Sequence, residues 1–194
     1  MIVCVEGNIG SGKSTVLQTL RDTHGYTVKE EPIDEWADLL DLYYDCPSKW
    51  ALAFNLKVLH SFRSIPEPPQ GAPHQVVCVE RSPGACRHVF GQLGYNDEHM
   101  TPAAWDIFKE YHDLLTWEPD AYVYINTSPD RCFERIHTRG RQCEDGLDRE
   151  YLRRIEFQYT NYLKFTSKPV HTVNGDQDMD KVLSDVLQIL HHHL

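Results

Sequence analysis

The sequence predicts an α/β protein built on a parallel, doubly wound sheet of five strands flanked by helices. Short segments rich in Val, Ile or Tyr recur along the chain, and segments with apolar residues three or four apart lie between them. A glycine-rich loop also follows the first strand and opens the first helix. Strands that alternate with helices pair in parallel, because each helix returns the chain to the same edge of the sheet.

Five segments are predicted as strands: Met1–Glu6, Tyr26–Glu31, Gln75–Glu80, Ala121–Asn126 and Val170–Val173. Helices are predicted after the glycine-rich loop, along Trp50–Ile65 and Pro102–Trp117, after Ser128-Pro129, and from about Asp178 to Leu190. Proline suits a first helical turn, where its missing N–H would have no partner anyway. We expect one domain over residues 1–190 and a short tail over 191–194, because the Pro-rich stretch 66–74 is too short to separate domains.

The 194 residues carry a formal net charge of −10, with a pI near 5.5. A surface that coats nucleic acid is normally basic, so we expect no nucleic-acid partner. No apolar run reaches the roughly 18 residues of a membrane span, and no signal peptide precedes the first strand, so we expect no membrane partner and a cytoplasmic location. The six cysteines form no C-x-x-C pair, which favours free thiols over disulfides or zinc.

The glycine-rich loop fits the nucleotide-binding pattern G-x-x-x-x-G-K-[ST]. It comprises Gly7, Asn8, Ile9, Gly10, Ser11, Gly12, Lys13, Ser14 and Thr15. Glycines let backbone N–H groups turn inward toward a phosphate, and the helix N-terminus adds positive potential. Lys13 can reach the β- and γ-phosphates, and the Ser14 hydroxyl can bind Mg²⁺. We therefore expect this loop to bind a nucleoside triphosphate.

Acidic residues follow the second and third strands, at the sheet edge where ligands gather. Glu31 ends the second strand, Pro32 fixes the backbone beside it, and Trp36 is a candidate stacking wall. A phosphate acceptor could lie beside Glu31; the alternative is a solvated loop charge. Glu80 occupies the place of the Walker B acid, which holds Mg²⁺ directly or through water. Arg81 next to it is either a functional cation or half of a structural salt bridge.

Between Asp130 and Arg154 the acidic chain has its densest basic stretch: Arg131, Arg135, Arg139, Arg141, Arg149, Arg153 and Arg154. A charge run is usually a solvated face. Arg135, Arg139 and Arg141, however, lie where a helix gives way to a glycine-containing loop. Beside a phosphate-binding loop, this favours a lid over about 135–146 that neutralises a transferring phosphoryl group and excludes water.

Four ordered motifs together resemble the deoxyribonucleoside kinases: the loop at 7–15, Glu31-Pro32-Ile33 with Trp36, Glu80-Arg81-Ser82, and the stretch from Arg135 to Glu144. That family includes insect multisubstrate deoxynucleoside kinase, mitochondrial thymidine kinase and deoxycytidine kinase. The likeness spans nearly the whole chain, whose compact size resembles a viral member and would imply the host cytoplasm. It implies a P-loop kinase fold with an Arg-rich lid that transfers the γ-phosphate of ATP to the 5′-hydroxyl of a deoxyribonucleoside in nucleotide salvage.

The resemblance implies catalytic roles residue by residue. Glu31 matches the general base that takes the proton of the 5′-hydroxyl, and Arg81 the arginine that orients it. Ser14 and Glu80 match the Mg²⁺ ligands. Further cations are matched to the transferring phosphoryl group: Lys13, Arg135, Arg139 and Arg141.

The resemblance also implies how the substrates are held. Tyr44 and Glu144 match the pair that hydrogen-bonds the sugar 3′-hydroxyl, a geometry that favours deoxyribose. Trp36 and Phe90 match the aromatic walls that sandwich the base. The loop after the last strand, matched to the adenine of ATP, contains Asp176 and Gln177.

Three positions bear on the choice of base. The family usually places Gln where this chain has Asn55, which keeps the amide but is about 1.5 Å shorter, more than a hydrogen bond tolerates. Either the helix sits closer, a water bridges the gap, or the choice of base is altered. Cys86 and Phe62 align with a charged Asp/Arg pair of the branch that prefers deoxycytidine and purines. An uncharged, bulky pocket is similar to the thymidine-preferring branch, so we expect thymidine first and deoxycytidine tolerated.

Other functions were weighed on the same residues. A thymidylate or other nucleoside-monophosphate kinase needs a basic or Gly-rich acceptor site after the second strand, where this chain has acids: Glu30, Glu31, Asp34 and Glu35. A non-catalytic family relative is disfavoured by the intact Lys13, Glu31 and Arg81, and a regulatory GTPase by the lack of an Asn-Lys-x-Asp motif. The resemblance further implies a homodimer, through helices 50–65 and 102–117, and feedback inhibition by a deoxynucleoside triphosphate.

Overall fold

The computed structural model describes residues 1–141, 144 and 146–192. Five strands form one parallel sheet in the order β2-β3-β1-β4-β5. They are β1 (Ile2–Glu6), β2 (Thr27–Lys29), β3 (Val77–Glu80), β4 (Ala121–Asn126) and β5 (Val170–Asn174). The predicted α/β class and all five strands are confirmed, and only the strand ends differ, most of all in the short β2.

Nine α-helices surround the sheet in the part of the chain described: α1 (Lys13–His24), α2 (Ala37–Asp45), α3 (Pro47–Ser61), α4 (Pro83–Ala85), α5 (Gln92–Asn96), α6 (Pro102–Leu115), α7 (Pro129–Arg139), α8 (Arg149–Phe165) and α9 (Met179–His192). A 3₁₀ turn covers Ile33–Glu35, and a π-helical turn, Cys86–Gly91, joins α4 to α5. The helix expected over Trp50–Ile65 ends already at Ser61, and the one expected to reach Trp117 ends at Leu115. Helices α2, α4, α5 and α8 were not predicted.

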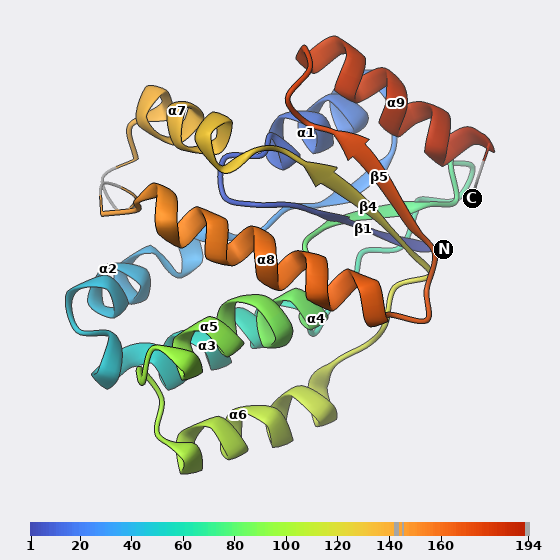
Figure 1. The fold of residues 1–194 in the computed structure, drawn as a ribbon. Coiled ribbons are helices and arrows are strands. Elements are labelled where there is room, and N and C mark those ends of the chain that lie inside the picture. Colours follow the sequence, from blue (N-terminus) through green and yellow to red (C-terminus); the bar gives the residue numbers. More distant parts are fainter. Residues whose placement is uncertain (142–143, 145, 193–194) are drawn as a thin grey trace.

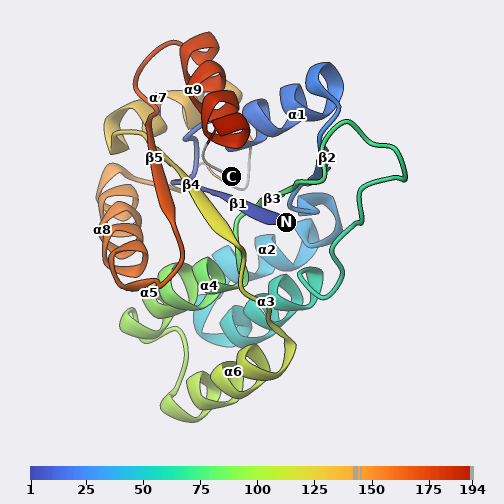
Figure 2. The same ribbon diagram turned by 90° about the vertical axis from the view of Figure 1, so that its right-hand side faces the viewer.

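Each face of the sheet carries its own apolar layer, because side chains alternate along a strand. Val3 and Val5 point to the layer that α1 and α9 cover, and Cys4 points to the layer that α8 covers. Helix α6 lies farther out, beyond α3 and α5 (Figures 1 and 2). A third cluster, from Trp36 across α3 to the π-helical turn and α6, joins this outer part to the core. It forms the wall of the site described next.

The fold also shows the environment of the cysteines and the lengths of the helices. The cysteines within the described residues are free thiols: Cys4, Cys46, Cys78, Cys86 and Cys132. All of them except Cys46 are buried. No helix of the described ranges has the length and apolar character that a membrane span requires.

Candidate active site

A cavity of about 460 Å³ opens at the carboxyl ends of β1, β2 and β3. It gathers most of the predicted site residues: Ile9, Gly10, Gly12, Lys13, Ser14, Thr15, Glu31, Trp36, Tyr44, Asn55, Phe62, Glu80, Arg81, Cys86, Phe90, Arg135, Arg139, Arg141 and Glu144. Segments far apart in the sequence therefore meet at the edge of the sheet where ligands are expected. Gly7, Asn8 and Ser11 belong to the same loop but are not among the lining residues.

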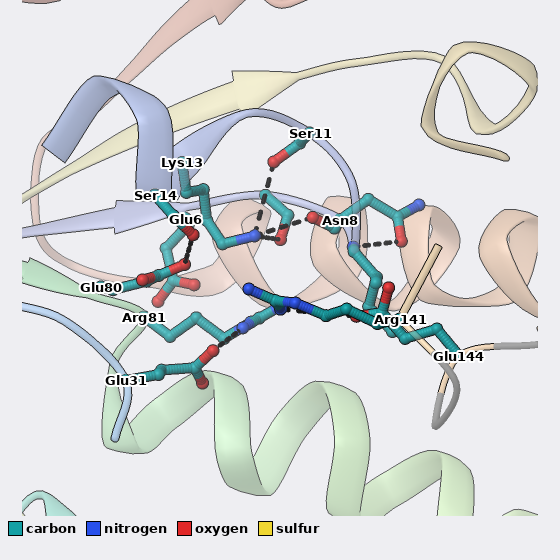
Figure 3. Close-up of polar contacts among 12 residues, drawn as sticks. Glu6, Asn8, Ser11, Lys13, Ser14, Glu31, Glu80, Arg81, Arg141 and Glu144 are labelled. Atoms are coloured by element: carbon teal, nitrogen blue, oxygen red, sulfur yellow. Dashed lines mark hydrogen bonds and ion pairs between the residues drawn. The ribbon is translucent and has the colours of Figure 1, made fainter. Parts of the chain in front are cut away.

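The loop between β1 and α1 holds Lys13 in a buried position. Its Nζ donates hydrogen bonds to the backbone oxygens of Gly7, at 3.1 Å, and Asn8, at 2.8 Å (Figure 3). Burial, and then the charge of Arg81, lower the pKa of Lys13 to about 8. The Asn8 side chain in turn donates to the backbone oxygen of Leu152 at 2.8 Å. The phosphate-binding loop is thereby tied to α8.

Gly7 cannot be replaced without moving this loop. Its φ is +152°, and an added Cβ would lie 2.6 Å from Ser11 Oγ and 2.7 Å from the backbone oxygen of Ile125. We expect Gly7→Ala to lower the free energy of unfolding by about 1–3 kcal/mol, because overpacking and an unfavourable φ act together. Urea denaturation measures this. The matched control is Gly146→Ala, where a Cβ meets nothing within 4 Å; equal losses in the two variants would contradict the prediction.

Glu31 and Arg81 point toward each other and form an ion pair inside the cavity (Figure 3). Their side chains are only 10% and 11% exposed. Arg81 has a left-handed backbone, with a φ of 60°, and its guanidinium carbon lies 4.9 Å from the centre of the Phe90 ring. Burial raises the pKa of Glu31, and Arg81 opposes that rise. For Arg81, burial alone would lower the pKa, but the negative charge of Glu31 helps to raise it.

Ser14 and Glu80 meet across the cavity floor. Ser14 Oγ donates to Glu80 Oε1 at 2.9 Å, and Glu80 is buried. Hydroxyl and carboxylate oxygens are the donors that Mg²⁺ prefers, so the pair fits the predicted ion. No cluster of three or more His, Cys, Asp or Glu that could hold a metal occurs in the described ranges. Mg²⁺ typically takes one or two carboxylates and completes its shell with water and substrate phosphates.

In the segment predicted as a lid, α7 ends at Arg139 and is followed by Gly140, which has a left-handed φ of 64°. Arg135 lies deepest, and its guanidinium donates to the backbone oxygens of Ser11 and Gly175, at 3.1 Å each. Arg139 Nη2 donates to both carboxylate oxygens of Glu144, at 2.7 and 2.6 Å. Arg141 lies 3.7 Å from the same carboxylate. Other positions of the lid and of the tail lie outside the described residues: Gln142, Cys143, Asp145, His193 and Leu194.

Another part of the cavity is aromatic and uncharged. The Trp36 and Phe54 rings are 6.1 Å apart, and the buried indole nitrogen of Trp36 has no hydrogen-bond partner among the described residues. Asn55 Nδ2 donates to the backbone oxygen of Ala51, at 2.8 Å. Cys86 Sγ lies 4.0 Å from the Asn55 backbone oxygen. A flat, partly polar ring system is the ligand that such surroundings accommodate.

Two predicted contacts with adenine do not reach this cavity. Asp176 Oδ1 accepts from the backbone N–H and the hydroxyl of Ser128, at 2.9 Å each. Gln177 Nε2 donates to Asp185 at 2.7 Å. Neither residue lines the cavity, because each is bonded to its own neighbourhood after β5. Instead, Met179 at the start of α9 lines it from that side.

The loop, the ion pair and the arginines were described from this chain alone, and a comparison with known protein families gives a consistent result. Residues 3–193 match the family model described as deoxynucleoside kinase. The chain belongs to the deoxynucleoside kinase family. The family uses ATP as phosphate donor and acts on deoxynucleosides, so the resemblance deduced from four motifs is confirmed.

Individual relatives of this kinase include viral and vertebrate proteins. It is 30% identical to a putative kinase protein of Invertebrate iridescent virus 3, over 97% of this chain and 95% of that protein. It is 30% identical to a probable deoxycytidine kinase of Fowlpox virus, over 91% and 79% of the two chains. It is 29% identical to a mitochondrial deoxyguanosine kinase of Xenopus laevis, over 91% and 82%. The viral relatives are consistent with the resemblance of this compact chain to a viral member of the family.

Several lining residues were not predicted: Ile33, Leu40, Tyr43, Phe54, Val58, Ser82, Tyr151 and Met179. Val58 lies three positions after Asn55 on α3 and four after Phe54, so helical spacing from Asn55 could have indicated Val58, and Phe54 through it. Tyr43 stacks on Phe54 with ring centres 5.1 Å apart. Tyr151 belongs to α8, a helix that was not predicted because the basic composition of the segment was interpreted differently.

Proposed function

We propose that this deoxynucleoside kinase phosphorylates the 5′-hydroxyl of pyrimidine deoxynucleosides, thymidine first and deoxycytidine second, with Glu31 as general base. The Glu31–Arg81 pair beside the phosphate-binding loop carries the proposal. As the 5′-oxygen attacks the γ-phosphorus and the bond to the β-phosphate oxygen breaks, Glu31 accepts the hydroxyl proton. Arg81 orients both the carboxylate and the 5′-oxygen. A neighbouring carboxylate suits an uncharged nucleoside better than a nucleotide acceptor.

The residues assigned to the phosphates share a positive charge or an N–H donor: Lys13, Arg135, Arg139, Arg141 and the loop from Gly7 to Thr15. Ser14 and Glu80 would hold Mg²⁺, which when bound neutralises charge on the phosphates. We expect Glu80→Gln to raise the Mg²⁺ concentration for half-maximal activity by at least about 10–100-fold, the loss that even an outer-shell partner of a metal produces. A magnesium titration at saturating ATP measures this. Unchanged magnesium dependence would remove Glu80 from the site.

The base preference rests on the aromatic part of the cavity. Phe62 and Cys86 carry no charge, and the Phe62 ring fills space that a purine would need. Both features favour thymidine. Two relatives carry the name deoxycytidine kinase, which is an argument for deoxycytidine as the preferred substrate. Apolar contacts discriminate only modestly between substrates, so we expect the two pyrimidines to differ by about tenfold or less. Measurement of kcat/KM for the four deoxynucleosides and for dTMP tests this. A purine preference would overturn the assignment of the base, and phosphorylation of dTMP alone would make the protein a thymidylate kinase.

The dimer is proposed from α6. Ile107, Tyr111 and Leu114 are exposed and lie on one helical stripe, with i, i+4 and i+7 spacing. A second copy would bury this stripe in the manner of a homodimer interface. We expect Leu114→Lys to convert a dimer into a monomer in multi-angle light scattering. The control is Phe165→Lys, an equally exposed apolar residue on α8. A wild-type monomer at micromolar concentration would contradict the proposal.

Two further properties are carried over from the resemblance alone. We propose that the triphosphate of the preferred nucleoside inhibits by occupying the acceptor and phosphate parts of the cavity together. We also propose that the kinase works in the cytoplasm, of a host cell if it is viral. Competition of the triphosphate with both substrates tests the first proposal, and imaging of the tagged full chain tests the second.

A further inference from the structure

Two side chains from other elements hold the C-terminal end of α3. Carbonyl groups at the end of a helix have no partner within the helix, so another group must satisfy them. Trp117, in the connection between α6 and β4, donates from Nε1 to the backbone oxygen of Phe62 at 2.8 Å. Lys29, the last residue of β2, donates from Nζ to the backbone oxygen of Ser61 at 2.5 Å and to that of Ser64. The end of this helix is therefore fixed to parts of the chain that are remote in sequence.

Phe62 is both the residue that Trp117 holds and a part of the cavity wall. It directly follows α3, its side chain is buried, and it lines the cavity. The Phe62 and Trp117 rings lie 6.4 Å apart at an interplanar angle of 71°, the edge-to-face geometry that aromatic rings prefer. Trp117 does not itself line the cavity. It therefore restrains the backbone and the ring of a cavity-lining residue from outside the cavity.

The position of this wall matters because α3 carries much of the aromatic, uncharged part of the cavity. Phe54, Asn55 and Val58 line the cavity from this helix. An apolar wall selects substrates by shape, and a change of one methylene group alters discrimination by about 10–200-fold. A Phe62 ring that is free to move back would leave room for a larger base, so its restraint is a means of selection.

We propose that Trp117 is a positioning residue for base selection, because its indole N–H holds the Phe62 ring in the cavity and thereby disfavours purines. This inference rests on the proposed function and deepens its preference for pyrimidines. An indole nitrogen is a hydrogen-bond donor only, so the Phe62 backbone oxygen is a partner that suits it. Lys29 supports the same helix end from β2, two residues before Glu31. The wall for the base and the acid for the 5′-hydroxyl are thus connected through one short segment.

The test compares Trp117→Phe with Trp105→Phe in the full-length kinase. Both changes remove an indole N–H and keep an aromatic ring. Trp105 is buried in the same apolar cluster as Phe62, stacks on Tyr95 and Phe108, and does not line the cavity. For Trp117→Phe we expect the ratio of kcat/KM for deoxyguanosine to kcat/KM for thymidine to rise at least about tenfold. The KM for ATP should not change. A loss of stability alone would lower both rates equally and leave the ratio as it is.

A double variant tests whether Trp117 acts through Phe62. In a Phe62→Ala background the ring is gone, so Trp117→Phe should leave the ratio unchanged, as expected for two residues that act in series. The inference is overturned if Trp117→Phe keeps the wild-type ratio, if Trp105→Phe raises it equally, or if the rise persists without the Phe62 ring. If Trp117→Phe does not fold, Lys29→Met is the second variant, and an unchanged ratio there likewise overturns the inference.

Binding measurements separate this inference from the proposed function. Calorimetric titration of deoxyguanosine and thymidine without ATP gives the ratio of their two Kd values in each variant, and no turnover is needed. A wild-type protein that phosphorylates no deoxynucleoside refutes the proposed function, and a wild-type preference for purines refutes its choice of base. In both cases the change of the Kd ratio in Trp117→Phe still decides the positioning role. Binding of neither nucleoside would overturn both.

Discussion

Replacement of Glu31 by glutamine is expected to lower kcat by about 10²–10⁴-fold, the usual contribution of a positioned general base. Glutamine keeps the size of the side chain and can still accept a hydrogen bond from Arg81, but it cannot take up the proton of the 5′-hydroxyl. The KM for ATP should change little, since we assign the binding of the triphosphate to the loop after β1. Initial rates with thymidine measure both constants.

The neighbouring acid provides the control for this experiment. Glu30 is bonded to Arg21 at 2.6 Å and does not line the cavity, so Glu30→Gln should retain kcat within about twofold. In the wild type, burial raises the pKa of Glu31, and only the carboxylate can act as base. Activity should therefore fall on the acidic side at a higher pH than an exposed glutamate would give. A Glu31→Gln variant with wild-type kcat would exclude Glu31 as the base.

Replacement of Arg81 by methionine is expected to lower the free energy of unfolding by about 3–5 kcal/mol at pH 8, because it leaves the Glu31 carboxylate buried without its partner. Urea denaturation measures this loss. Arg153→Met is the control, because its pair with Glu150 is exposed at both ends, by 54% and 70%. Exposed pairs contribute only about 0.2–1 kcal/mol. Activity should be lost in the first variant alone.

The pH dependence of that loss follows from the sign of the Glu31 shift. Without Arg81, the folded state favours the protonated carboxyl, so its pKa lies above that of the unfolded chain. Stability is then retained at low pH and lost as the pH rises through the raised pKa. The double variant Glu31→Gln with Arg81→Met should recover part of the loss at pH 8. A stability deficit that is the same at every pH would show that the ion pair is not its cause.

The parts of the site that follow directly from strand ends could be predicted from the sequence. Glu31 and Glu80 end or follow parallel strands, and the loop after β1 has a fixed pattern, so their meeting point was determined by topology. Helix α8 was missed because its arginines suggested a lid, although Leu152, Ile155 and Tyr159 form an apolar stripe with helical spacing. Helix α2 has no buried residues, but Leu40, Tyr43 and Tyr44 lie at helical spacing and line the cavity, so this helix was missed although its sequence carries an apolar stripe.

Other features depend on tertiary packing and leave little trace in the sequence. The π-helical turn Cys86–Gly91 brings Cys86 and Phe90 to the cavity. Such turns are rare and occur mostly as single turns within α-helices, often at functional sites. Asp176 and Gln177 were matched to the adenine of ATP by resemblance; their side chains bond to Ser128 and Asp185, and neither residue lines the cavity. A match by resemblance alone could not reveal those partners.

The ion pair between Arg139 and Glu144 would link the binding of the two substrates. Under the roles proposed for Arg139 and Glu144, Arg139 Nη2 has to leave the carboxylate, whose two oxygens it bonds in this arrangement, before that nitrogen can donate to a triphosphate. Once released, the carboxylate becomes available to a sugar hydroxyl. Donor and acceptor should thus strengthen each other's affinity by one and the same factor, even though no atom of one need touch the other's recognition groups.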